Sequence, residues 1–377
     1  MTKTLFVDAH TFDESHQGIR TFLKGIYKAI DACPSELQIY LAANNIDNLK
    51  KEFNSQPNFK FIKLKSKNKY IRLTYEIPKI IKGYKFDFAH FNYYLPLFLN
   101  KKCKYIVTIH DVLFIDFPQY FPLKYRLVNT ILFKRSALKA NIVTTVSNYS
   151  AERIIENFKI SNKKIEVLPN AISKKYALTQ NKESDRNFIK TNYNLNKYII
   201  YVSRIEPRKN HFKLVQAYEE LSLWKQGVSL VLIGQESFKD DELDKLINKV
   251  SKVSNGMILK IKDVSNDDLI KFYNAATLAI FPSLCEGFGI PPIESAVLKT
   301  STICSDSTAM KDFTFFKDRL FDAKSIDTIK TTITKFLEKE KHSDQHNELT
   351  EIANSIKEKY TWDQTAQKLK NLILNDK

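Results

Sequence analysis

The chain has 377 residues and a formal net charge of +17 at pH 7. Its length favours two domains over a single core, and a hydrophobic content of 43% with an aromatic content of 12% excludes an intrinsically disordered chain. The charge predicts attraction to polyanions, anionic membrane surfaces or phosphorylated substrates without choosing among them.

The cysteine pattern and the hydropathy indicate the reducing cytosol. The four cysteines, Cys33, Cys103, Cys285 and Cys304, are scattered and form no C-x-x-C pair, so neither a disulfide framework nor a zinc site is indicated. Residues 1–7 form a short strand-like run rather than a leader peptide, and no apolar run approaches the ~20 residues that span a bilayer. We therefore expect a cytoplasmic protein whose association with the inner face of the membrane is at most peripheral.

The first half of the chain alternates strands and helices, which is typical of an α/β domain. Strands are predicted over residues 4–7, 37–42, 59–64, 86–91, 105–109, 142–146 and 165–168. Helices are predicted over residues 18–32, 72–82, 123–140 and 148–157. Gly18, at the start of the first helix, is a candidate phosphate-facing residue, although a loop without a ligand explains it equally well.

Two basic segments of this half have both a structural and a functional interpretation. The run from Lys63 to Lys69, followed by Arg72, is typical of a solvated, self-repelling loop, but it could also hold an anionic acceptor or a lipid headgroup. The helix over residues 123–140 carries lysine and arginine among leucine, isoleucine and phenylalanine. Such a helix can lie on a membrane surface, or it can pack into the core with a solvated outer face.

His110 and Asp111 directly follow the strand predicted over residues 105–109. They therefore lie at the carboxyl end of that strand, which is the edge where open α/β sheets bind ligands. A lone histidine is commonly structural, so a catalytic and a structural role are equally consistent with this position.

A polar, poorly periodic stretch divides the chain. We expect an amino-terminal domain over residues 1–178, a linker over 179–196, a carboxyl-terminal domain over 197–359 and a final segment, 360–377, whose helix can cross back to the first domain. From residue 198 to residue 304 strands and helices alternate again with short loops, which predicts a second parallel sheet. Two such domains in tandem are expected to face each other across a cleft.

The most informative stretch is FPSLCEGFGIPPIESA at residues 281–296, which predicts a buried strand, a glycine loop and a helix that begins near Pro292. The glycines allow backbone amides to approach a ligand, and the unpaired amides of the helix start favour an anion there. Glu286 and Glu294 could each accept hydrogen bonds from a pair of sugar hydroxyls. A solvated loop charge and a first-turn acid favoured by the helix dipole are the structural alternatives.

Arg204 and Lys209, in the stretch SRIEPRKN, follow the strand predicted over residues 198–202 and so share the ligand-binding edge with the Glu286 loop. Two fixed cations beside a helix amino terminus would stabilise the charge that develops on a departing diphosphate. A charged turn before a helix is the structural alternative.

Several rival sites are absent from the sequence. There is no G-x-x-x-x-G-K-[ST] phosphate loop, no G-x-G-x-x-G after a strand, no H-E-x-x-H and no G-x-S-x-G. The D-x-D pattern that many metal-dependent sugar transferases use is also missing. The basic residues are spread along the chain rather than gathered with stacking aromatics, which argues against a nucleic-acid binder.

Together these motifs resemble the retaining, nucleotide-sugar-dependent glycosyltransferases of family four, which have the α/β GT-B fold of two Rossmann-like domains with parallel sheets facing a central cleft. The most specific motif is the E-x7-E block from Glu286 to Glu294. Its support comes from SRIEPRKN, His110-Asp111, TVSNYS at residues 145–150, VLPNAI at 167–172 and Tyr360-Thr-Trp362. The resemblance covers nearly the whole chain.

The resemblance implies a role for each of these residues. Glu294 would bind the ribose hydroxyls, and Glu286 would bind the hydroxyls of the transferred sugar. Arg204 and Lys209 would neutralise the diphosphate, and His110 would face the donor sugar near its reacting carbon. The implied catalytic residues are His110, Glu286, Arg204 and Lys209, and the implied donor-binding residues are Gly18, Arg204, Lys209, Glu286, Gly287, Phe288, Gly289, Ile290 and Glu294. Gly18 departs from the family pattern, which usually has two glycines in that loop.

The resemblance also implies the chemistry. Family members mostly need no metal or other cofactor, and they transfer with retention through a front-face, oxocarbenium-like path in which the leaving phosphate helps to deprotonate the acceptor. The implied reaction moves a hexose from GDP-mannose or a UDP-sugar to a glycan or lipid-linked acceptor in the biosynthesis of a surface polysaccharide such as lipopolysaccharide. The implied partners are that donor, that acceptor and an anionic membrane surface, with no nucleic acid.

Two other functions stay open at the level of the sequence. A glycan hydrolase could use Glu286 and Glu294 as its acid and base, and it would release free sugar without any nucleotide. A non-catalytic module could bind polyanions through its net charge of +17, with an affinity that falls steeply with salt.

Overall fold

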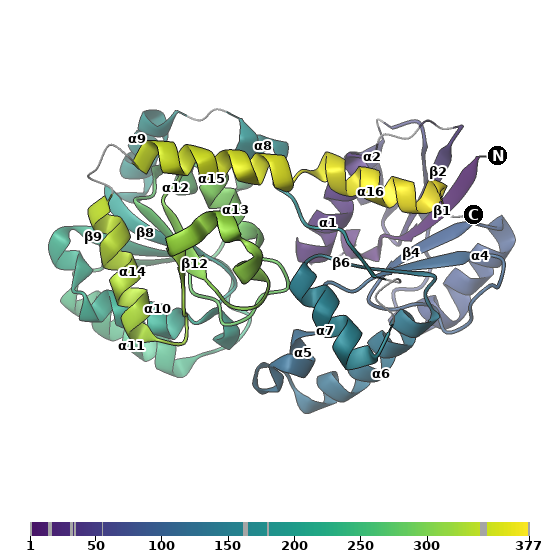
Figure 1. Cartoon of the computed structure of the whole chain (residues 1–377), viewed down its shortest axis with the longest axis horizontal. Helices are drawn as coiled ribbons and strands as arrows, with labels where there is room; N and C mark the ends of the chain where they lie inside the picture. Colours follow the sequence, from purple (N-terminus) through teal and green to yellow (C-terminus); the bar gives the residue numbers. More distant parts are fainter. Residues whose placement is uncertain are drawn as a thin grey trace. The chain divides into compact units, whose positions relative to one another are not determined.

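The chain forms two compact units in the computed structural model (Figure 1). Unit 1 comprises Met1–Ala171 together with Tyr360–Lys377, and unit 2 comprises Ile172–Lys359. The boundary therefore falls earlier than residue 178, where the sequence analysis placed the end of the first domain. The structure describes residues 2–13, 17–30, 33, 35–54, 56–160, 165–178, 181–339 and 345–375.

Unit 1 contains, over the part that is described, a seven-stranded parallel sheet with the order β3-β2-β1-β4-β5-β6-β7. Its strands are β1 (Lys3–Asp8), β2 (Leu37–Ala43), β3 (Phe59–Lys63), β4 (Phe88–Asn92), β5 (Lys104–Thr108), β6 (Ile142–Thr145) and β7 (Ile165–Val167). The strand order reverses between β1 and β4, and ligands of open α/β sheets bind at the carboxyl ends of the strands near such a reversal. Every predicted strand of this half is confirmed within a few residues.

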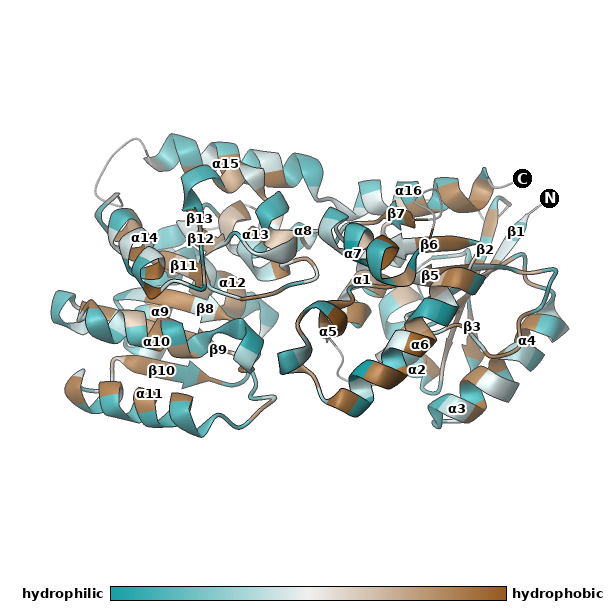
Figure 2. Ribbon diagram, turned by 60° about the horizontal axis from the view of Figure 1, so that its bottom comes forward, coloured by the Kyte–Doolittle hydropathy of each residue, from teal (hydrophilic) through white to brown (hydrophobic). Residues whose placement is uncertain are grey.

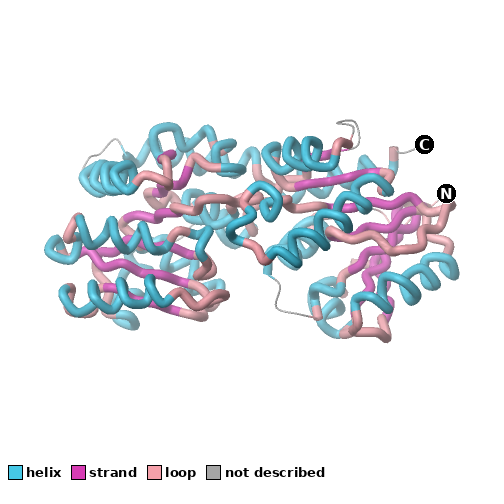
Figure 3. The backbone as a smooth tube through the Cα atoms, turned by 90° about the horizontal axis from the view of Figure 1, so that it is seen from below, coloured by secondary structure: helices cyan, strands magenta, loops and turns pink. Residues whose placement is uncertain are grey.

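Helices cover both faces of this sheet, which is why β1 and β4 are buried so completely (Figure 3). They are α1 (Gln17–Lys28), α2 (Ile46–Phe53), α3 (Lys69–Ile71), α4 (Ile77–Tyr84), α5 (Leu113–Asp116), α6 (Leu123–Lys139), α7 (Asn148–Phe158) and α16 (Trp362–Leu374). A π-helical turn, η2 (Arg72–Glu76), joins α3 to α4, and short 3-10 turns occur at η1 (His10–Phe12) and η3 (Pro118–Tyr120). No helix among the described residues combines the length and apolar composition that crossing a membrane requires.

The final helix, α16, packs within unit 1 against α1. Gly25 permits this contact, because a Cβ atom at that position would lie 2.2 Å from Cε2 of Trp362. The Thr365 hydroxyl donates a hydrogen bond of 3.0 Å to the carbonyl oxygen of Pro169. The last segment of the chain is thereby part of the core of unit 1.

Unit 2 contains, over its described residues, a six-stranded parallel sheet with the order β10-β9-β8-β11-β12-β13. Its strands are β8 (Lys197–Val202), β9 (Val228–Ile233), β10 (Ile258–Ile261), β11 (Leu278–Phe281), β12 (Thr302–Ser305) and β13 (Leu320–Phe321). Its helices are α8 (Lys174–Ala177), α9 (Lys182–Tyr193), α10 (His211–Glu220), α11 (Asp241–Val253), α12 (Asn266–Ala275), α13 (Ile290–Val297), α14 (Ile326–Lys339) and α15 (Gln345–Lys359). Strands β9 and β11 are buried along their whole length, as continuous apolar runs predict for the centre of a parallel sheet.

The expected linker over residues 179–196 is wrong, because most of this stretch forms helix α9 of unit 2. The side chain of Asn181 caps the helix by accepting hydrogen bonds from two backbone N–H groups of its first turn. Ile189 is fully buried, and Asp185 accepts a hydrogen bond of 2.7 Å from the Asn274 side chain of α12. The helix is stabilised by packing on α12, which its mostly polar sequence does not reveal.

Candidate active site

The stretch SRIEPRKN forms an irregular connection at the carboxyl end of β8. It includes a 3-10 turn over Pro207–Lys209, and Asn210 then adopts a left-handed conformation with φ 60° before α10 begins. Asn210 is the N-cap residue of α10, but its side chain forms no capping hydrogen bond. Its amide instead donates hydrogen bonds to the carbonyl oxygens of Pro282 (3.1 Å) and Ala323 (2.8 Å). These bonds fix the cationic turn against the loop that follows β11.

Gly234, directly after β9, allows the same turn to approach the sheet. It has φ 147°, and a Cβ atom at that position would lie 2.0 Å from the carbonyl oxygen of Ser203. Any other residue would therefore displace the backbone that carries Arg204. Gly234 is not among the residues predicted from the sequence, although a glycine directly after a buried strand is a recognisable signal for close backbone approach.

The loop between β11 and α13 turns at a glycine. Gly289 adopts φ 100° and ψ 68°, and a Cβ atom there would lie 2.9 Å from Cγ of Met310. Helix α13 begins at Ile290, two positions earlier than Pro292, so Pro291 occupies its first turn. Pro291 and Pro292 have no N–H, so the backbone donors that this helix start can offer a ligand are those of Gly289 and Ile290.

Glu286 is bound on both of its carboxylate oxygens by cations of the SRIEPRKN turn. Lys209 donates to Oε1, and Nη1 of Arg208 lies 3.2 Å from Oε2. Arg208 also donates to the carbonyl oxygen of Cys285 at 3.0 Å and forms an ion pair of 2.6 Å with Glu206. The structure thus brings Glu286 and Lys209 together, as expected from the sequence.

Arg208 was missed by the sequence analysis, which named Arg204 and Lys209 as the two fixed cations. Arg204 is exposed and forms no ion pair with the described residues, so it is not one of the cations that hold Glu286. Three basic side chains within six residues look alike in sequence, and only their backbone geometry decides which two face the carboxylate.

The two glutamates of the E-x7-E block have opposite electrostatic environments. Burial alone would raise the pKa of Glu286, but Lys209 and Arg208 outweigh it and lower the pKa to about 2. Burial lowers the pKa of Lys209 more than the neighbouring Glu286 raises it, and Arg208 lowers it further. Burial raises the pKa of Glu294 to about 7. Glu286 is therefore ionised at neutral pH, whereas Glu294 is near its midpoint.

Glu294 lies just beyond the first turn of α13, and its carboxyl group has no hydrogen bond or ion pair with any described residue. Its neighbours include Tyr176 and Tyr273, whose phenol pKa values are raised first by burial and then by this carboxylate. The hydroxyl of Tyr273 is also buried without a hydrogen-bond partner among the described residues. A partly buried carboxyl without donors is a site that hydroxyl groups of a ligand could complete.

The remaining predicted residues of this loop surround the glutamates. Gly287 directly follows Glu286, and Ile290 is the first residue of α13. Phe288 is buried and packs edge to face on Phe313, with ring centroids 5.6 Å apart. The Phe288 ring thus anchors the loop in the core, and any contact it makes with a ligand comes from its backbone.

His110 belongs to unit 1, where it follows β5 as predicted. It is buried, its Nε2 lies 2.9 Å from Oδ1 of Asn92, and its ring packs edge to face on Phe22 at 5.1 Å. Burial lowers the pKa of His110 to about 4, so the imidazole is neutral at pH 7. It can orient or hydrogen-bond a ligand, but it does not supply a positive charge.

Gly18 is exposed in α1 and has no special backbone geometry. No heavy atom lies within 4 Å of where a Cβ would be placed, and its φ is not in the left-handed region. Nothing in the described structure therefore requires glycine at this position. The residues directly before it, 14–16, are outside the described ranges.

No group of three or more histidine, cysteine, aspartate or glutamate side chains within the described residues is arranged to hold a metal ion.

Two family models match the chain, and they correspond to the two halves of the molecule. The model described as "Glycosyltransferase Family 4" matches residues 34–175, and the model described as "Glycosyl transferases group 1" matches residues 181–355. The chain belongs to the family 4 glycosyltransferases.

Curated relatives of this family 4 chain include O-antigen chain mannosyltransferase B of Escherichia coli. It is 28% identical over 249 residues, which are 66% of this chain and 64% of the relative. The N-acetylgalactosamine-N,N'-diacetylbacillosaminyl-diphospho-undecaprenol 4-alpha-N-acetylgalactosaminyltransferase of Campylobacter jejuni is 30% identical over 180 residues, which are 48% of this chain and 45% of the relative. The chain thus spans less than two thirds of the length of either protein.

Among solved structures, HepE of Anabaena in complex with UDP-glucose is similar over 100% of both chains, with a TM-score of 0.73 at 13% identity. At that identity the likeness shows the fold alone. The two Rossmann-like parallel-sheet domains of the GT-B fold, expected from the sequence, are confirmed.

Proposed function

We propose that this family 4 glycosyltransferase moves a hexose, with retention and without a metal ion, from a nucleotide-diphosphate sugar to a glycan or lipid-linked acceptor in surface polysaccharide biosynthesis. The observation that carries the proposal is the Glu286 carboxylate, held ionised by Lys209 and Arg208 beside the start of α13. The names of the two relatives support a mannosyl and an N-acetylgalactosaminyl donor respectively, and both concern the assembly of glycans.

Glu294 is the residue we assign to the nucleotide ribose. Its carboxyl group has no donor within the described chain, and burial raises its pKa to about 7. The two vicinal hydroxyls of a ribose would supply the missing hydrogen bonds. They would also favour the ionised form, because hydrogen bonds donated to a carboxylate lower its pKa.

Glu286 is the residue we assign to the transferred sugar. An ionised carboxylate has about four acceptor positions, and Lys209 and Arg208 use one on each oxygen. The remaining positions can accept hydrogen bonds from sugar hydroxyls. Because the cations fix the carboxylate in place, the sugar would be held in a defined orientation at little cost in side-chain entropy.

The diphosphate would lie between the amide end of α13 and the SRIEPRKN turn. Backbone N–H groups and the helix dipole favour an anion at such a helix start. Arg204, exposed and without an ion pair among the described residues, can pair with the diphosphate when it arrives. With Arg208 and Lys209 close by, these groups can supply the positive charge that a metal provides in other transferases, which supports metal independence.

Retention follows in this proposal from a front-face path. The leaving diphosphate oxygen accepts the proton of the attacking hydroxyl on the face from which it departs, so no separate carboxylate base is required. Neither glutamate is then a proton-transfer group. The neutral His110 can donate or accept a hydrogen bond at the donor sugar without adding charge to the oxocarbenium-like centre.

A hydrolase is the second candidate, and the separated pKa values of Glu286 and Glu294 favour it. One ionised and one protonated carboxyl are what a glycoside hydrolase needs for its base or nucleophile and its acid. The ion pairs on both oxygens of Glu286 and the membership in family 4 favour transfer instead. Release of free sugar from glycans in the absence of any nucleotide would support hydrolysis.

A membrane surface is the proposed place of action because of the side chains on the outer face of α6. Its apolar side chains lie on both faces: Phe133 and Ala137 are buried, whereas Leu123, Leu127 and Ile131 are 62%, 60% and 69% exposed. The exposed three follow the i, i+4 spacing of one helical stripe. Figure 2 shows brown, hydrophobic segments of α6 between teal, hydrophilic ones. A helix with a basic and apolar outer face is suited to lie on an anionic bilayer.

The reaction itself can be tested by incubating the protein with UDP-, GDP- and ADP-sugars and glycan acceptors, and following the anomeric configuration of the product by NMR. We expect a product that keeps the donor configuration and forms in the presence of a chelator. The variant Glu286→Ala should lose at least about a hundredfold in rate, as loss of a preorganised charged contact typically costs. The control Glu338→Ala removes an exposed carboxylate of α14 and should retain the rate. Turnover in Glu286→Ala equal to that of the control would contradict the assigned site.

A further inference from the structure

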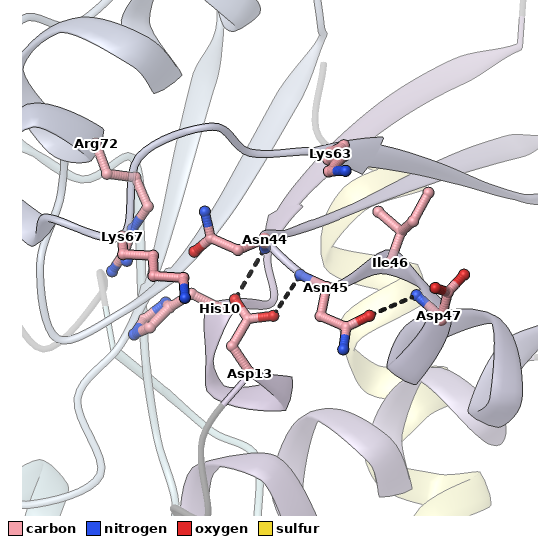
Figure 4. Close-up of a pocket in the computed structure, with 9 residues that line it drawn as sticks. All are labelled: His10, Asp13, Asn44, Asn45, Ile46, Asp47, Lys63, Lys67 and Arg72. Carbon is pink, nitrogen blue, oxygen red and sulfur yellow. Dashed lines mark hydrogen bonds between the residues drawn. The ribbon is translucent and has the colours of Figure 1, made fainter.

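A polar pocket lies in unit 1, at the carboxyl ends of the neighbouring strands β1, β2 and β3 (Figure 4). Its volume is about 600 Å³. It is lined by His10, Asp13, Asn44, Asn45, Ile46, Asp47, Lys63, Lys67 and Arg72. Three of these are the cations of the basic run that the sequence analysis left with two interpretations, so the pocket gives that run a defined structural context.

Arg72 is a buried cation with an incomplete set of hydrogen bonds. The residue is 5% exposed, in the π-helical turn between α3 and α4. Its Nε has no hydrogen-bond partner among the described residues, and the nearest carboxylate oxygen, Oδ2 of Asp8, is 3.9 Å away. A buried guanidinium normally has its N–H groups paired, because leaving them unpaired costs several kcal/mol. An anion in the pocket would complete its partners.

Two lysines add positive charge to the same pocket. Lys63 and Lys67 are exposed, and neither forms an ion pair with the described residues. Figure 4 shows the side chains of Lys67, Arg72 and His10 close together on one side of the pocket. Nearby Lys69 has its pKa lowered to about 8, first by burial and then by Arg72. Three cations therefore line the pocket together with Asp13 and Asp47, and Lys63 and Lys67 form no ion pair with either carboxylate among the described residues.

The loop that carries the lysines is held in place rather than solvated freely. The Glu76 carboxylate accepts hydrogen bonds from the backbone N–H groups of Lys65 (2.5 Å) and Ser66 (3.0 Å). Asn68 caps α3 by accepting bonds from two backbone N–H groups of its first turn. The lysine side chains are thus presented from an ordered backbone, which lowers the entropic cost of binding a ligand.

The acids that line the pocket are already engaged. The two oxygens of Asp13 accept hydrogen bonds from the backbone N–H groups of Asn44 (2.9 Å) and Asn45 (2.7 Å). Asp47 is largely exposed and lies 3.9 Å from Lys50. Asp8 lies next to Arg72, and its Oδ1 is 3.0 Å from Nδ1 of His10. These carboxylates shape the pocket, and none of them forms an ion pair with Lys63 or Lys67 among the described residues.

We propose that this pocket binds a phosphate group, with Arg72, Lys63 and Lys67 as its ligands, and that the phosphate is the one that links a glycan acceptor to its lipid. The second part rests on the proposed glycosyltransferase function, whereas the first does not. A diphosphate that links a glycan to a lipid carries about one negative charge on each phosphate, which favours a site beside Lys63 and Lys67, and its oxygens suit the N–H fork of an arginine. The cavity volume leaves room for the group to which the phosphate is attached.

The test compares four full-length proteins: the native chain, Lys63→Gln with Lys67→Gln, Arg72→Lys, and the control Lys65→Gln with Lys82→Gln. The control removes two exposed charges from the same unit without touching the pocket. Dissociation constants are measured at fixed ionic strength for inorganic phosphate, for a polyprenyl diphosphate in detergent and for glucuronate, and binding to phosphatidylglycerol vesicles is measured in parallel. Phosphate binding by the nucleotide site of unit 2 contributes equally to all four proteins and cancels.

We expect polyprenyl diphosphate and inorganic phosphate to bind at least about tenfold more weakly to the double-glutamine pocket variant than to the control, since two charge-assisted hydrogen bonds are lost. If the site holds the phosphate of a lipid-linked acceptor, the lipid diphosphate should bind and inorganic phosphate should compete with it. If the site holds free phosphate, inorganic phosphate should bind and the lipid diphosphate should not. Equal binding by the pocket variant and the control, or binding of glucuronate in preference to phosphate, would overturn the proposal. So would a loss confined to phosphatidylglycerol vesicles, which would make the lysines a general membrane contact.

Folding and donor binding are read separately. Lys63 and Lys67 are exposed, so their variants keep the test valid even if Arg72→Lys fails to fold. Nucleotide-dependent thermal stabilisation should be the same in all four proteins. If nucleotides stabilise none of them while phosphate binding still depends on the lysines, the proposed function fails and the phosphate site stands.

Discussion

Replacing Glu294 with glutamine should stabilise the protein at high pH while weakening donor binding. Glu294→Gln keeps the shape of the side chain and removes the charge. Burial raises the pKa of Glu294 from 4.5 to about 7, so the folded protein binds this proton more tightly than the unfolded chain does. The carboxyl group therefore costs stability when it is forced to ionise, and the neutral amide avoids that cost.

The magnitude follows from the pKa difference. Below pH 4.5 the carboxyl is protonated in both states, and no penalty exists. As pH rises toward 7 the unfolded chain ionises first, so the free energy of unfolding falls, and above pH 7 the loss levels off. The difference between 4.5 and about 7, at roughly 1.4 kcal/mol per pH unit, corresponds to about 3 kcal/mol. Glu294→Gln should be more stable than the native protein by up to this amount at pH 8 and by little at pH 4.5.

The assay is denaturant or thermal unfolding of both proteins at pH 4.5, 6 and 8, combined with a titration of the donor nucleotide. A gain of about 3 kcal/mol would raise the melting temperature of unit 2 by several degrees, at roughly 2–4 °C per kcal/mol. Donor affinity should fall because the amide can accept from one ribose hydroxyl less well than the carboxylate accepts from two. A stability gain that is the same at pH 4.5 and pH 8, or a loss at pH 8, would refute this account of Glu294.

Three further predictions concern the donor site and the outer surface of unit 1. Donor affinity of the native protein should fall as pH is lowered below about 7, approaching tenfold per pH unit, because Glu294 must release its proton to accept hydrogen bonds from the ribose hydroxyls. Calorimetric titrations from pH 5.5 to 8.5 should show this slope. The variant Glu294→Gln should lack it. Gly289→Ala should lower the free energy of unfolding by about 1–3 kcal/mol and weaken donor binding, because φ is 100° and Cγ of Met310 would lie 2.9 Å from the new Cβ. The control Gly18→Ala has open space around it and should leave the melting temperature and the donor affinity unchanged. Equal effects of the two changes would contradict the assigned backbone roles. The double variant Leu127→Asp with Ile131→Asp should reduce binding to phosphatidylglycerol vesicles by about tenfold or more in a flotation assay, since two exposed apolar side chains of α6 are lost. The control Phe238→Asp with Val253→Asp in unit 2 should not reduce binding. Unchanged binding by the α6 variant would exclude α6 as the membrane contact.

The sequence predicted the parallel sheets well because strands buried on both faces are continuous apolar runs bounded by polar loops. Strand β11 is one example, and the loop after it was recognisable from its glycines and prolines. Helix α9 was missed because its sequence has no such apolar pattern. Its surface is mostly polar, and its stability comes from an asparagine cap and from packing on α12, neither of which appears as periodicity.

The candidate site was predictable in its residue types but not in its pairings. The sequence placed Glu286 and Lys209 on one sheet edge, which the structure bears out. It could not distinguish Arg208 from Arg204, because a 3-10 turn and the contact at Gly234 decide which side chain faces the carboxylate. The pKa values near 2 and 7 of the two glutamates depend on burial and neighbouring charges, which are properties of the folded chain.

Thermal unfolding of the intact chain in the presence of UDP, GDP, ADP and their sugars tests the central claim most directly. One nucleotide family should raise the melting temperature selectively, by the equivalent of about 2.7 kcal/mol at a hundredfold excess over its dissociation constant. The shift should persist with a chelator, and the additional shift that the sugar nucleotide gives over the free nucleotide should be lost in Glu286→Ala. No shift with any nucleotide, or equal shifts with all of them and with inorganic diphosphate, would contradict the assignment of the Glu286–Glu294 loop as a nucleotide-sugar site.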